Sequence, residues 1–201
     1  MTEARTPDAR VIILGNTQVG KTALLSRFID KTYTPTTTST VTPVLSPTVV
    51  QTNNGESVHM QFWDTAGQER YQSIGQVFYR SANFAIMCYD CSDENPLPAL
   101  QKWKQNILNV EPDCQLYLAG TKYDLIDPSK QLEIIESGER LKGTLGCLGF
   151  FATSAVTGDG VDILFSSIAD NWYNQIKSKP AKTPQNAMNQ KTKDNNGGCC
   201  K

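Results

Sequence analysis

The chain has 201 residues, of which 39% are hydrophobic, and a net charge of -1. This length favours one domain with a tail, and the hydrophobic content is too high for a disordered chain. No apolar run approaches the roughly 20 residues that a membrane-spanning helix needs. Six lysines lie in residues 177–201, so the rest of the chain is acidic, which does not favour nucleic-acid binding. The polar start, MTEARTPDAR, predicts neither a secretory signal nor N-myristoylation.

The first predicted strand, RVIIL, leads directly into GNTQVGKT, residues 15–22. This stretch matches G-x-x-x-x-G-K-[ST], a loop whose backbone N–H groups and following helix N-terminus bind phosphate. Gly15 and Gly20 permit the close turn, Lys21 reaches the outer phosphates, and the hydroxyl of Thr22 is suited to Mg²⁺. A glycine-rich turn without a ligand is the alternative for an isolated match. The position between a strand and a helix favours phosphate binding.

Apolar strands alternate with amphipathic helices along the chain. Helices are predicted over residues 22–31, 97–110, 131–145 and 161–176, and buried strands over MQFWD, FAIMCYD, QLYLAG and GFFATS. This alternation predicts an α/β fold, with a mostly parallel sheet, helices on both faces, and ligands beyond the carboxyl ends of the strands. VLSPTVVQ and SVHMQFW form a predicted hairpin around Asn53-Asn54-Gly55, and Pro47 favours an edge strand for the first, antiparallel arm.

A second motif, WDTAGQERY, follows a predicted strand. Asp64 at the end of that strand is suited to the shell of a Mg²⁺ ion. The N–H of Gly67 can approach the terminal phosphate, and Gln68 can orient an attacking water. For this motif alone, the alternative is a capped turn from strand to loop.

Two later loops are suited to a purine base. In GTKYDL, the Asp124 carboxylate can accept hydrogen bonds from the guanine N1–H and exocyclic amine, a donor pair that adenine lacks. In ATSAVTG, a backbone N–H near Ala155 can donate to the guanine oxygen. Each loop alone could be an ordinary connection after a strand. Four motifs in this order and at this spacing predict a guanine-nucleotide site.

These motifs resemble those of small GTPases of the Ras superfamily, and WDTAGQERY, FYRSANFAIMCYD and the terminal GGCCK are most similar to the Rab family. The resemblance covers residues 10–176. It implies the P-loop NTPase fold, with a six-stranded sheet and five helices, together with Mg²⁺ and a cycle between GTP and GDP. The expected parts are an N-terminal extension at residues 1–9, a GTPase domain at 10–176 and a disordered hypervariable tail at 177–201.

The resemblance also implies roles for individual residues. Gln68, Lys21 and Thr40 are expected to be catalytic. Thr22, Thr40 and Asp64 are expected to bind Mg²⁺, with Thr40 doing so only while the terminal phosphate is present. The nucleotide is expected to contact Gly15, Gln18, Val19, Gly20, Lys21, Thr22, Ala23, Tyr33, Thr40, Asp64, Gly67, Thr121, Lys122, Asp124, Ser154 and Ala155.

The phosphate loop departs from the usual Rab pattern, because Asn16, Thr17 and Gln18 replace D-S-G. Glutamine tolerates a positive φ less well than the glycine usual at this position. We interpret Gln18 as pointing outward over the nucleotide's rim, where it shields the phosphates or alters the access of an activator's arginine. Thr121 replaces the asparagine of N-K-x-D, a change that Rho-type relatives share.

The first switch also differs from the Rab pattern. The resemblance assigns an effector surface to Leu45, Trp63 and Phe78, with leucine replacing phenylalanine at the first position. Ordinary core packing is the alternative for the two aromatic residues, since large aromatic side chains are usually mostly buried.

Cys88 and Cys91 form a C-x-x-C pair, which suggests a redox or metal site. We favour buried, reduced cytosolic thiols, because Cys88 lies in an apolar run and further ligands are not visible. The single histidine, His59, is interpreted as a strand-face residue rather than a catalytic one.

The chain ends in GGCCK, with glycine where C-a-a-X prenylation would require cysteine. The resemblance implies a double-prenylation signal at Cys199 and Cys200, and two lipid chains give stable anchoring. The neighbouring lysines suit an anionic membrane surface. Two thiols in a solvated tail are the alternative.

Together these features predict a Rab-like GTPase: a membrane-recruited switch that hydrolyses GTP slowly and recruits effectors in vesicle traffic. Expected partners are an exchange factor, a GTPase-activating protein, and a GDP-dissociation inhibitor or escort protein. The expected location is cytoplasmic, on the cytosolic face of endomembranes. One alternative is a guanine-nucleotide-binding scaffold with little or no hydrolysis, and another is a metabolic P-loop kinase or ATPase.

Overall fold

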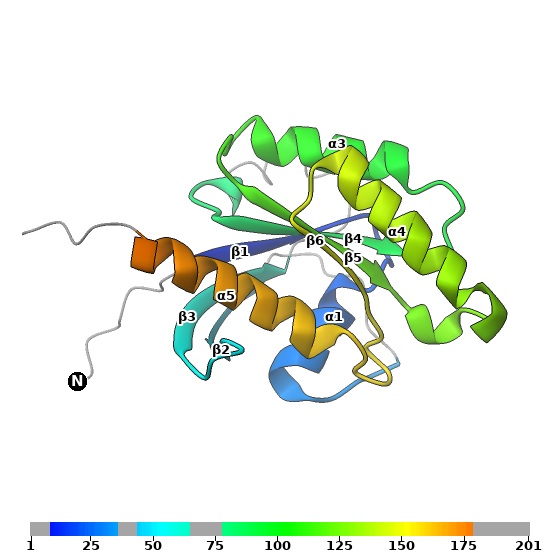
Figure 1. Cartoon of the computed structure of the whole chain (residues 1–201), viewed down its shortest axis with the longest axis horizontal. Coiled ribbons are helices and arrows are strands. Elements are labelled where there is room, and N and C mark those ends of the chain that lie inside the picture. Colours follow the sequence, from blue (N-terminus) through cyan, green and yellow to red (C-terminus); the bar gives the residue numbers. More distant parts are fainter. Residues whose placement is uncertain (1–8, 36–43, 65–77, 179–201) are drawn as a thin grey trace, which may run out of the picture.

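The computed structural model describes residues 9–35, 44–64 and 78–178, which form a three-layered α/β arrangement (Figure 1). The central layer is a six-stranded sheet in the order β2-β3-β1-β4-β5-β6. Only the β2–β3 pair is antiparallel, and the other neighbouring strands are parallel. The predicted mixed sheet is therefore confirmed. The strands are β1 (Ala9–Leu14), β2 (Val44–Gln51), β3 (Ser57–Asp64), β4 (Phe84–Asp90), β5 (Gln115–Thr121) and β6 (Gly149–Ala152).

Four α-helices lie in the described part of the chain: α1 (Lys21–Asp30), α3 (Leu97–Leu108), α4 (Gln131–Leu145) and α5 (Val161–Ser178). Two 3₁₀ turns, η2 (Tyr123–Leu125) and η3 (Pro128–Lys130), precede α4. The bounds of α4 match the prediction, because Gly146 adopts a left-handed φ of 66° and ends the helix. Helix α1 ends one residue earlier than predicted, since Lys31 is left-handed with a φ of 56°.

The helices cover the two faces of the sheet in pairs, with α1 and α5 on one face and α3 and α4 on the other (Figure 1). Side chains of β1 alternate between these faces, as strand geometry requires. Val11 and Ile13 pack in the cluster under α1 and α5, whereas Ile12 and Leu14 pack under α3 and α4. All four are fully buried, so β1 is the centre of both cores.

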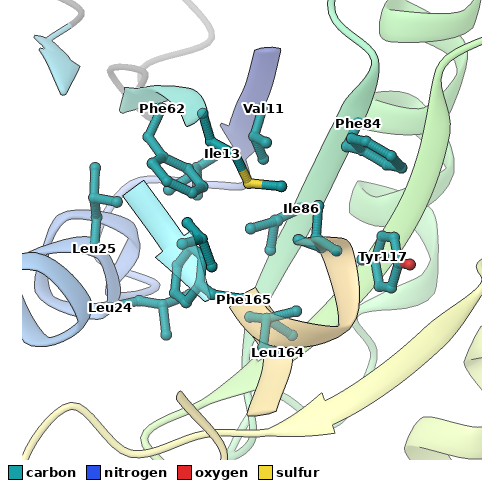
Figure 2. Packing of buried hydrophobic residues seen from close by; sticks show 14 of the residues in the cluster. Val11, Ile13, Leu24, Leu25, Phe62, Phe84, Ile86, Tyr117, Leu164 and Phe165 are labelled. Carbon is teal, nitrogen blue, oxygen red and sulfur yellow. The ribbon is translucent and has the colours of Figure 1, made fainter. Parts of the chain in front are cut away.

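Aromatic rings fill much of the core beneath α1 and α5 (Figure 2). Phe28 of α1 stacks on Phe165 of α5 with ring centroids 3.9 Å apart, and Phe62 of β3 meets Phe165 edge-on at 5.2 Å. These contacts fix α1, and with it the loop that enters α1, against the sheet.

The predicted hairpin forms at one edge of the sheet. Pro47 lies in β2, the edge strand, where its missing N–H does not interrupt an inner ladder. Gly55 takes a φ of 80° in the turn, a value that favours glycine. Asn53 donates its backbone N–H to Asp170 of α5 over 2.9 Å, so the turn is also attached to the last helix.

The thiols that the structure describes are free, and Cys88 and Cys91 are buried. Burial raises the pKa of each of these two thiols to about 12, which keeps them protonated. No cluster of potential metal-binding side chains occurs among residues 9–35, 44–64 and 78–178. The burial of Cys88 and Cys91 agrees with their interpretation as buried thiols. His59 lies in β3 opposite Val49, on a strand face as expected.

Within the same ranges, no helix is both long and apolar enough to cross a membrane.

Candidate functional site

The sequence motifs converge at the carboxyl ends of the parallel strands. Strand β1 ends at Leu14 and leads into the phosphate loop, residues 15–22. The register pairs Ile13 with Asp64, which places the end of β3 directly beside the start of that loop. Strands β5 and β6 deliver the two predicted base-binding loops to the same edge of the sheet.

Glycine is required at the start of the phosphate loop. Gly15 has a φ of 147°, and a Cβ added there would lie 2.4 Å from the carbonyl oxygen of Cys88. Gly20, with a φ of 91°, is the N-cap of α1, and the N–H of Leu24 donates to its carbonyl. Gln18 is exposed and has a φ of 64°, so the left-handed backbone suspected from the sequence is present with a glutamine in it.

Lys21 folds back over the phosphate loop. Its ammonium donates to the carbonyl oxygens of Gly15 at 2.9 Å and Asn16 at 2.8 Å. The residue is only 5% exposed, and burial lowers the pKa of Lys21 while Cys88 and Asp64 oppose that shift. A buried cation that donates to two carbonyl oxygens can exchange them for an anion, because a phosphate oxygen would neutralise its charge.

Thr22 and Asp64 meet although they are 42 positions apart in the chain. The Thr22 hydroxyl, in the first turn of α1, donates to the carboxylate of Asp64 at the end of β3 over 2.6 Å. Asp64 is 3% exposed. A hydroxyl and a carboxylate are the oxygen ligands that Mg²⁺ takes in proteins, so this pair has the chemistry of the predicted metal site.

Thr121, at the end of β5, joins the predicted base-binding loop to the phosphate loop. Its buried hydroxyl lies within hydrogen-bonding distance of the carbonyl oxygens of Val19 and Tyr89, the latter at 2.9 Å. Threonine at this position therefore retains a polar link between the two loops through its single hydroxyl.

Lys122 is left-handed, with a φ of 58°, and its ammonium forms an ion pair with Asp90 at 2.7 Å. Burial alone would raise the pKa of Asp90, but hydrogen bonds from Lys122 and Ser92 outweigh burial and lower it. The ion pair attaches the start of the base loop to the end of β4. Asp124 follows in η2 and is exposed, so a ligand can reach it.

The last predicted loop is attached to the base loop through its backbone. Tyr123 donates its N–H to the carbonyl of Thr153 over 3.1 Å, and Thr153 donates its own to Gly120 over 2.7 Å. Ser154 is fully buried, and its hydroxyl oxygen accepts from the N–H of Thr157. Ala155 is half-buried beside it.

The remaining predicted residues lie at the edge of the site or outside the described residues. Tyr33, after the end of α1, is 40% exposed. Val19 is buried and Ala23 half-buried, both at the phosphate loop and its helix. Five predicted residues lie outside the described ranges: Thr40, Gly67, Gln68, Cys199 and Cys200.

The three predicted effector residues are brought together by the β2–β3 edge. Leu45 pairs with Trp63 across the two strands, and the rings of Trp63 and Phe78 lie 5.4 Å apart. Leu45 is 41% exposed, and the two aromatic residues are half-buried against the core beneath α3 and α4. The Arg10 guanidinium lies over the Trp63 ring, 4.4 Å from its centroid. This cluster is partly core and partly surface.

Two residues near the site were not predicted. The indole N–H of Trp103, in α3, donates to the side-chain oxygen of Asn16 over 3.0 Å. Asp90 was also missed, although its place at the end of the apolar run FAIMCYD is a signal for a side chain at the carboxyl edge of the sheet. No local pattern links Trp103 to Asn16.

Comparison with known proteins agrees with this geometry. Residues 10–174 match the model of the Ras family. Rab-24 of Dictyostelium discoideum, a Ras-related protein, is 33% identical, and the match covers 96% of this chain and 97% of the relative. Rab-3C of Mus musculus, also Ras-related, is 36% identical over 87% of this chain and 77% of its own. The Ypt/Rab-type GTPase YPT7 of Saccharomyces cerevisiae is 33% identical, and the match covers 80% of this chain and 79% of the relative. The sheet order, the site geometry and these matches lead to one conclusion: the chain belongs to the Ras family and is a Rab-like small GTPase, an enzyme that hydrolyses GTP.

Proposed function

We propose that this GTPase acts as a Rab-type switch. In this role it binds GTP or GDP with Mg²⁺, hydrolyses GTP slowly and recruits effectors to a membrane in vesicle traffic. The observation that carries the proposal is the 2.6 Å contact between Thr22 and Asp64 beside the buried ammonium of Lys21. It supports a site that holds a metal ion and a polyphosphate together.

The phosphates bind along the N–H groups of residues 15–22 and at the N-terminus of α1. Lys21 exchanges its two carbonyl partners for oxygens of the outer phosphates. Asp124 accepts hydrogen bonds from guanine, and the ion pair between Lys122 and Asp90 holds the backbone that presents it. The same carboxylate repels the ring nitrogen acceptor of adenine, which selects the base.

Thr22 and Asp64 would hold the Mg²⁺, and Thr40 would join them while the terminal phosphate is present. When bound, the ion neutralises charge on the phosphate oxygens. Both described residues fit this role, because each offers a hard oxygen ligand and the two oxygens already lie 2.6 Å apart.

Hydrolysis transfers the terminal phosphoryl group to a water molecule that Gln68 orients. The chain contributes positioning and charge stabilisation rather than a titrating base, which is why we propose a slow intrinsic rate. An activating protein supplies an arginine and a rate increase of roughly 10³ to 10⁵. Gln18, exposed beside the phosphates, shields them or alters the access of that arginine.

The terminal phosphate orders the segments around Thr40 and Gly67, and its loss releases them. Leu45, Trp63 and Phe78 present the effector surface that responds to this change. Leucine at position 45 offers a smaller apolar side chain than phenylalanine, so the set of effectors differs from that of a typical Rab.

Prenyl groups on Cys199 and Cys200 anchor the protein to the cytosolic face of endomembranes, with the tail lysines adding attraction to anionic lipids. An exchange factor and a GDP-dissociation inhibitor or escort protein control membrane delivery. Localisation of a tagged full chain, compared with its double variant Cys199→Ser/Cys200→Ser, tests the anchor. Membrane association that survives the double substitution would contradict it.

The nucleotide is tested by identifying what the purified, denatured protein releases, and by calorimetric competition between guanine and adenine nucleotides. We expect guanine nucleotides only, and loss of this preference in Asp124→Ala. Single-turnover hydrolysis with and without Gln68→Leu then measures the rate. A rate that Gln68→Leu does not lower would favour the guanine-nucleotide scaffold over a cycling switch.

A further inference from the structure

We infer that Trp103 is a positioning residue of the nucleotide site, which holds the first turn of the phosphate loop through Asn16. The inference rests on the proposed binding of nucleotide phosphates at residues 15–22. It concerns a residue of α3 that lies outside all four nucleotide motifs.

The hydrogen bond between Trp103 and Asn16 is donated by a side chain that is packed in the core beneath α3. The Trp103 N–H donates to the side-chain oxygen of Asn16 over 3.0 Å, across 87 positions of sequence. Trp103 is 6% exposed and packs in the core cluster with Leu100 and Ile107, two fully buried residues of the same helix. Because the ring cannot move without disturbing this core, its N–H is a fixed point for the loop.

Asn16 is held at two points. Its side chain accepts from Trp103, and its backbone carbonyl accepts from the ammonium of Lys21 at 2.8 Å. The proposed function requires Lys21 to turn toward the phosphates, which removes the second contact. The Trp103 hydrogen bond then remains as the side-chain restraint on Asn16, next to Gly15, the residue that cannot carry a side chain. We therefore expect Trp103 to matter most when nucleotide is bound.

The other two tryptophans provide matched comparisons. The indole nitrogens of Trp63 and Trp172 are buried and make no hydrogen bond within the described residues. Trp172 packs its ring edge-on against Phe84, with centroids 6.0 Å apart, in the core beneath α1 and α5. Trp172→Phe therefore removes an indole N–H from the opposite face of the sheet without removing a hydrogen bond.

Dissociation of a fluorescent GDP analogue from the full chain tests the inference. We expect Trp103→Phe and Asn16→Ala each to accelerate dissociation by about threefold to tenfold, the range for loss of one hydrogen bond. The double variant should be no faster than the faster single variant, because both substitutions remove the same contact. Trp172→Phe should leave the rate unchanged. Asn16→Ala lies on an exposed loop and leaves the core intact, so the test stands even if Trp103→Phe folds poorly.

The three indole N–H signals in a ¹⁵N-correlated NMR spectrum give a second measurement, which reports the hydrogen bond itself, whereas the GDP dissociation rate reports its effect on the nucleotide site. Asn16→Ala should shift the Trp103 signal alone, and Asn16→Asp should keep it in its hydrogen-bonded position, since a carboxylate also accepts. The signals of Trp63 and Trp172 should stay in place.

Either of two results would overturn the inference: additive effects of the two single substitutions on dissociation, or a Trp103 signal that ignores Asn16→Ala. Lys21→Ala separates this outcome from failure of the proposed function. If Lys21→Ala weakens GDP binding strongly while Trp103→Phe and Asn16→Ala change nothing, the nucleotide site stands and Trp103 has no part in it. If Lys21→Ala leaves GDP affinity intact, the proposed phosphate site itself is wrong.

Discussion

The phosphate loop and the base loop place non-glycine residues in the left-handed region in different ways. Gln18 and Lys122 have φ values of 64° and 58°, each in a loop that follows a buried strand. The Lys122 side chain is anchored by an ion pair with Asp90, whereas Gln18 is exposed and makes no side-chain hydrogen bond within the described ranges. At Lys122, the ion pair with Asp90 of β4 therefore offsets the energetic cost of the left-handed backbone. At Gln18, the described residues show no contact that would offset this cost.

The comparison matters because a left-handed side chain motivates a hypothesis of function at Gln18. Lys122 is explained by the fold as well as by its predicted place at the base. For Gln18, we propose that its position over the bound phosphates explains it. Measuring the unfolding of each variant at two concentrations of GDP separates an effect on nucleotide binding from an effect on intrinsic stability.

Gly15→Ala should have the largest effect, because it breaks the phosphate loop itself. The added Cβ would lie 2.4 Å from the backbone oxygen of Cys88, at a φ of 147°. We expect a loss of about 3 kcal/mol or more in the free energy of unfolding, measured by denaturant titration. Gly55→Ala is the control, since its φ of 80° is unfavourable but the space around it is open. Equal losses in the two variants would mean that the close contact with β4 is not the cause.

Thr121→Val should disturb both loops at once. It removes the buried hydroxyl that lies between the carbonyl oxygens of Val19 and Tyr89. We expect a loss of about 2 kcal/mol in unfolding free energy, together with weaker GDP binding. Thr121→Ser keeps the hydroxyl and should lose much less. Similar behaviour of the valine and serine variants would show that the loops are joined by packing rather than by this hydroxyl.

Lys122→Met should remove the ion pair with Asp90, which anchors the base loop and has no counterpart at Gln18 among the described residues. We expect a loss of about 1 kcal/mol at pH 7, since the pair is partly exposed. The pKa of Asp90 is lowered from its ordinary 3.8, so the stabilisation is present above that value and is lost as the pH falls through the lower folded pKa. Unfolding measured from pH 7 down to pH 2.5 should therefore show the two proteins converging at the acid end. A constant difference across this range would contradict the role of the ion pair.

Gln18→Gly should have the smallest effect on stability and the opposite sign. Relief of the left-handed glutamine should raise the unfolding free energy by about 0.5 kcal/mol. Lys122→Gly relieves the same backbone cost but loses the ion pair, so it should destabilise. The nucleotide dissociation rate and the activator-stimulated hydrolysis of Gln18→Gly test its proposed functional role. If both are unchanged, Gln18 neither shields the phosphates nor affects access to them.

Much of the fold could be predicted because its signals are local. The apolar runs and the glycines of the first loop identified the strands and the phosphate-binding turn. The predicted end of α4 at residue 145 is correct, and Pro47 marks the edge strand. The end of α1 was misplaced by one residue because a left-handed lysine, unlike a glycine, carries no sequence signal for a helix end.

The sequence by itself determined which chemical groups this GTPase has and the order in which strands deliver them: an ammonium at 21, a hydroxyl at 22, and carboxylates at 64 and 124. Only the tertiary structure decided which of them meet. The hydrogen bonds from Thr22 to Asp64 and from Trp103 to Asn16 join segments 42 and 87 positions apart. Such pairs follow from strand register and helix packing, which depend on the whole core, and no local pattern of residues encodes them.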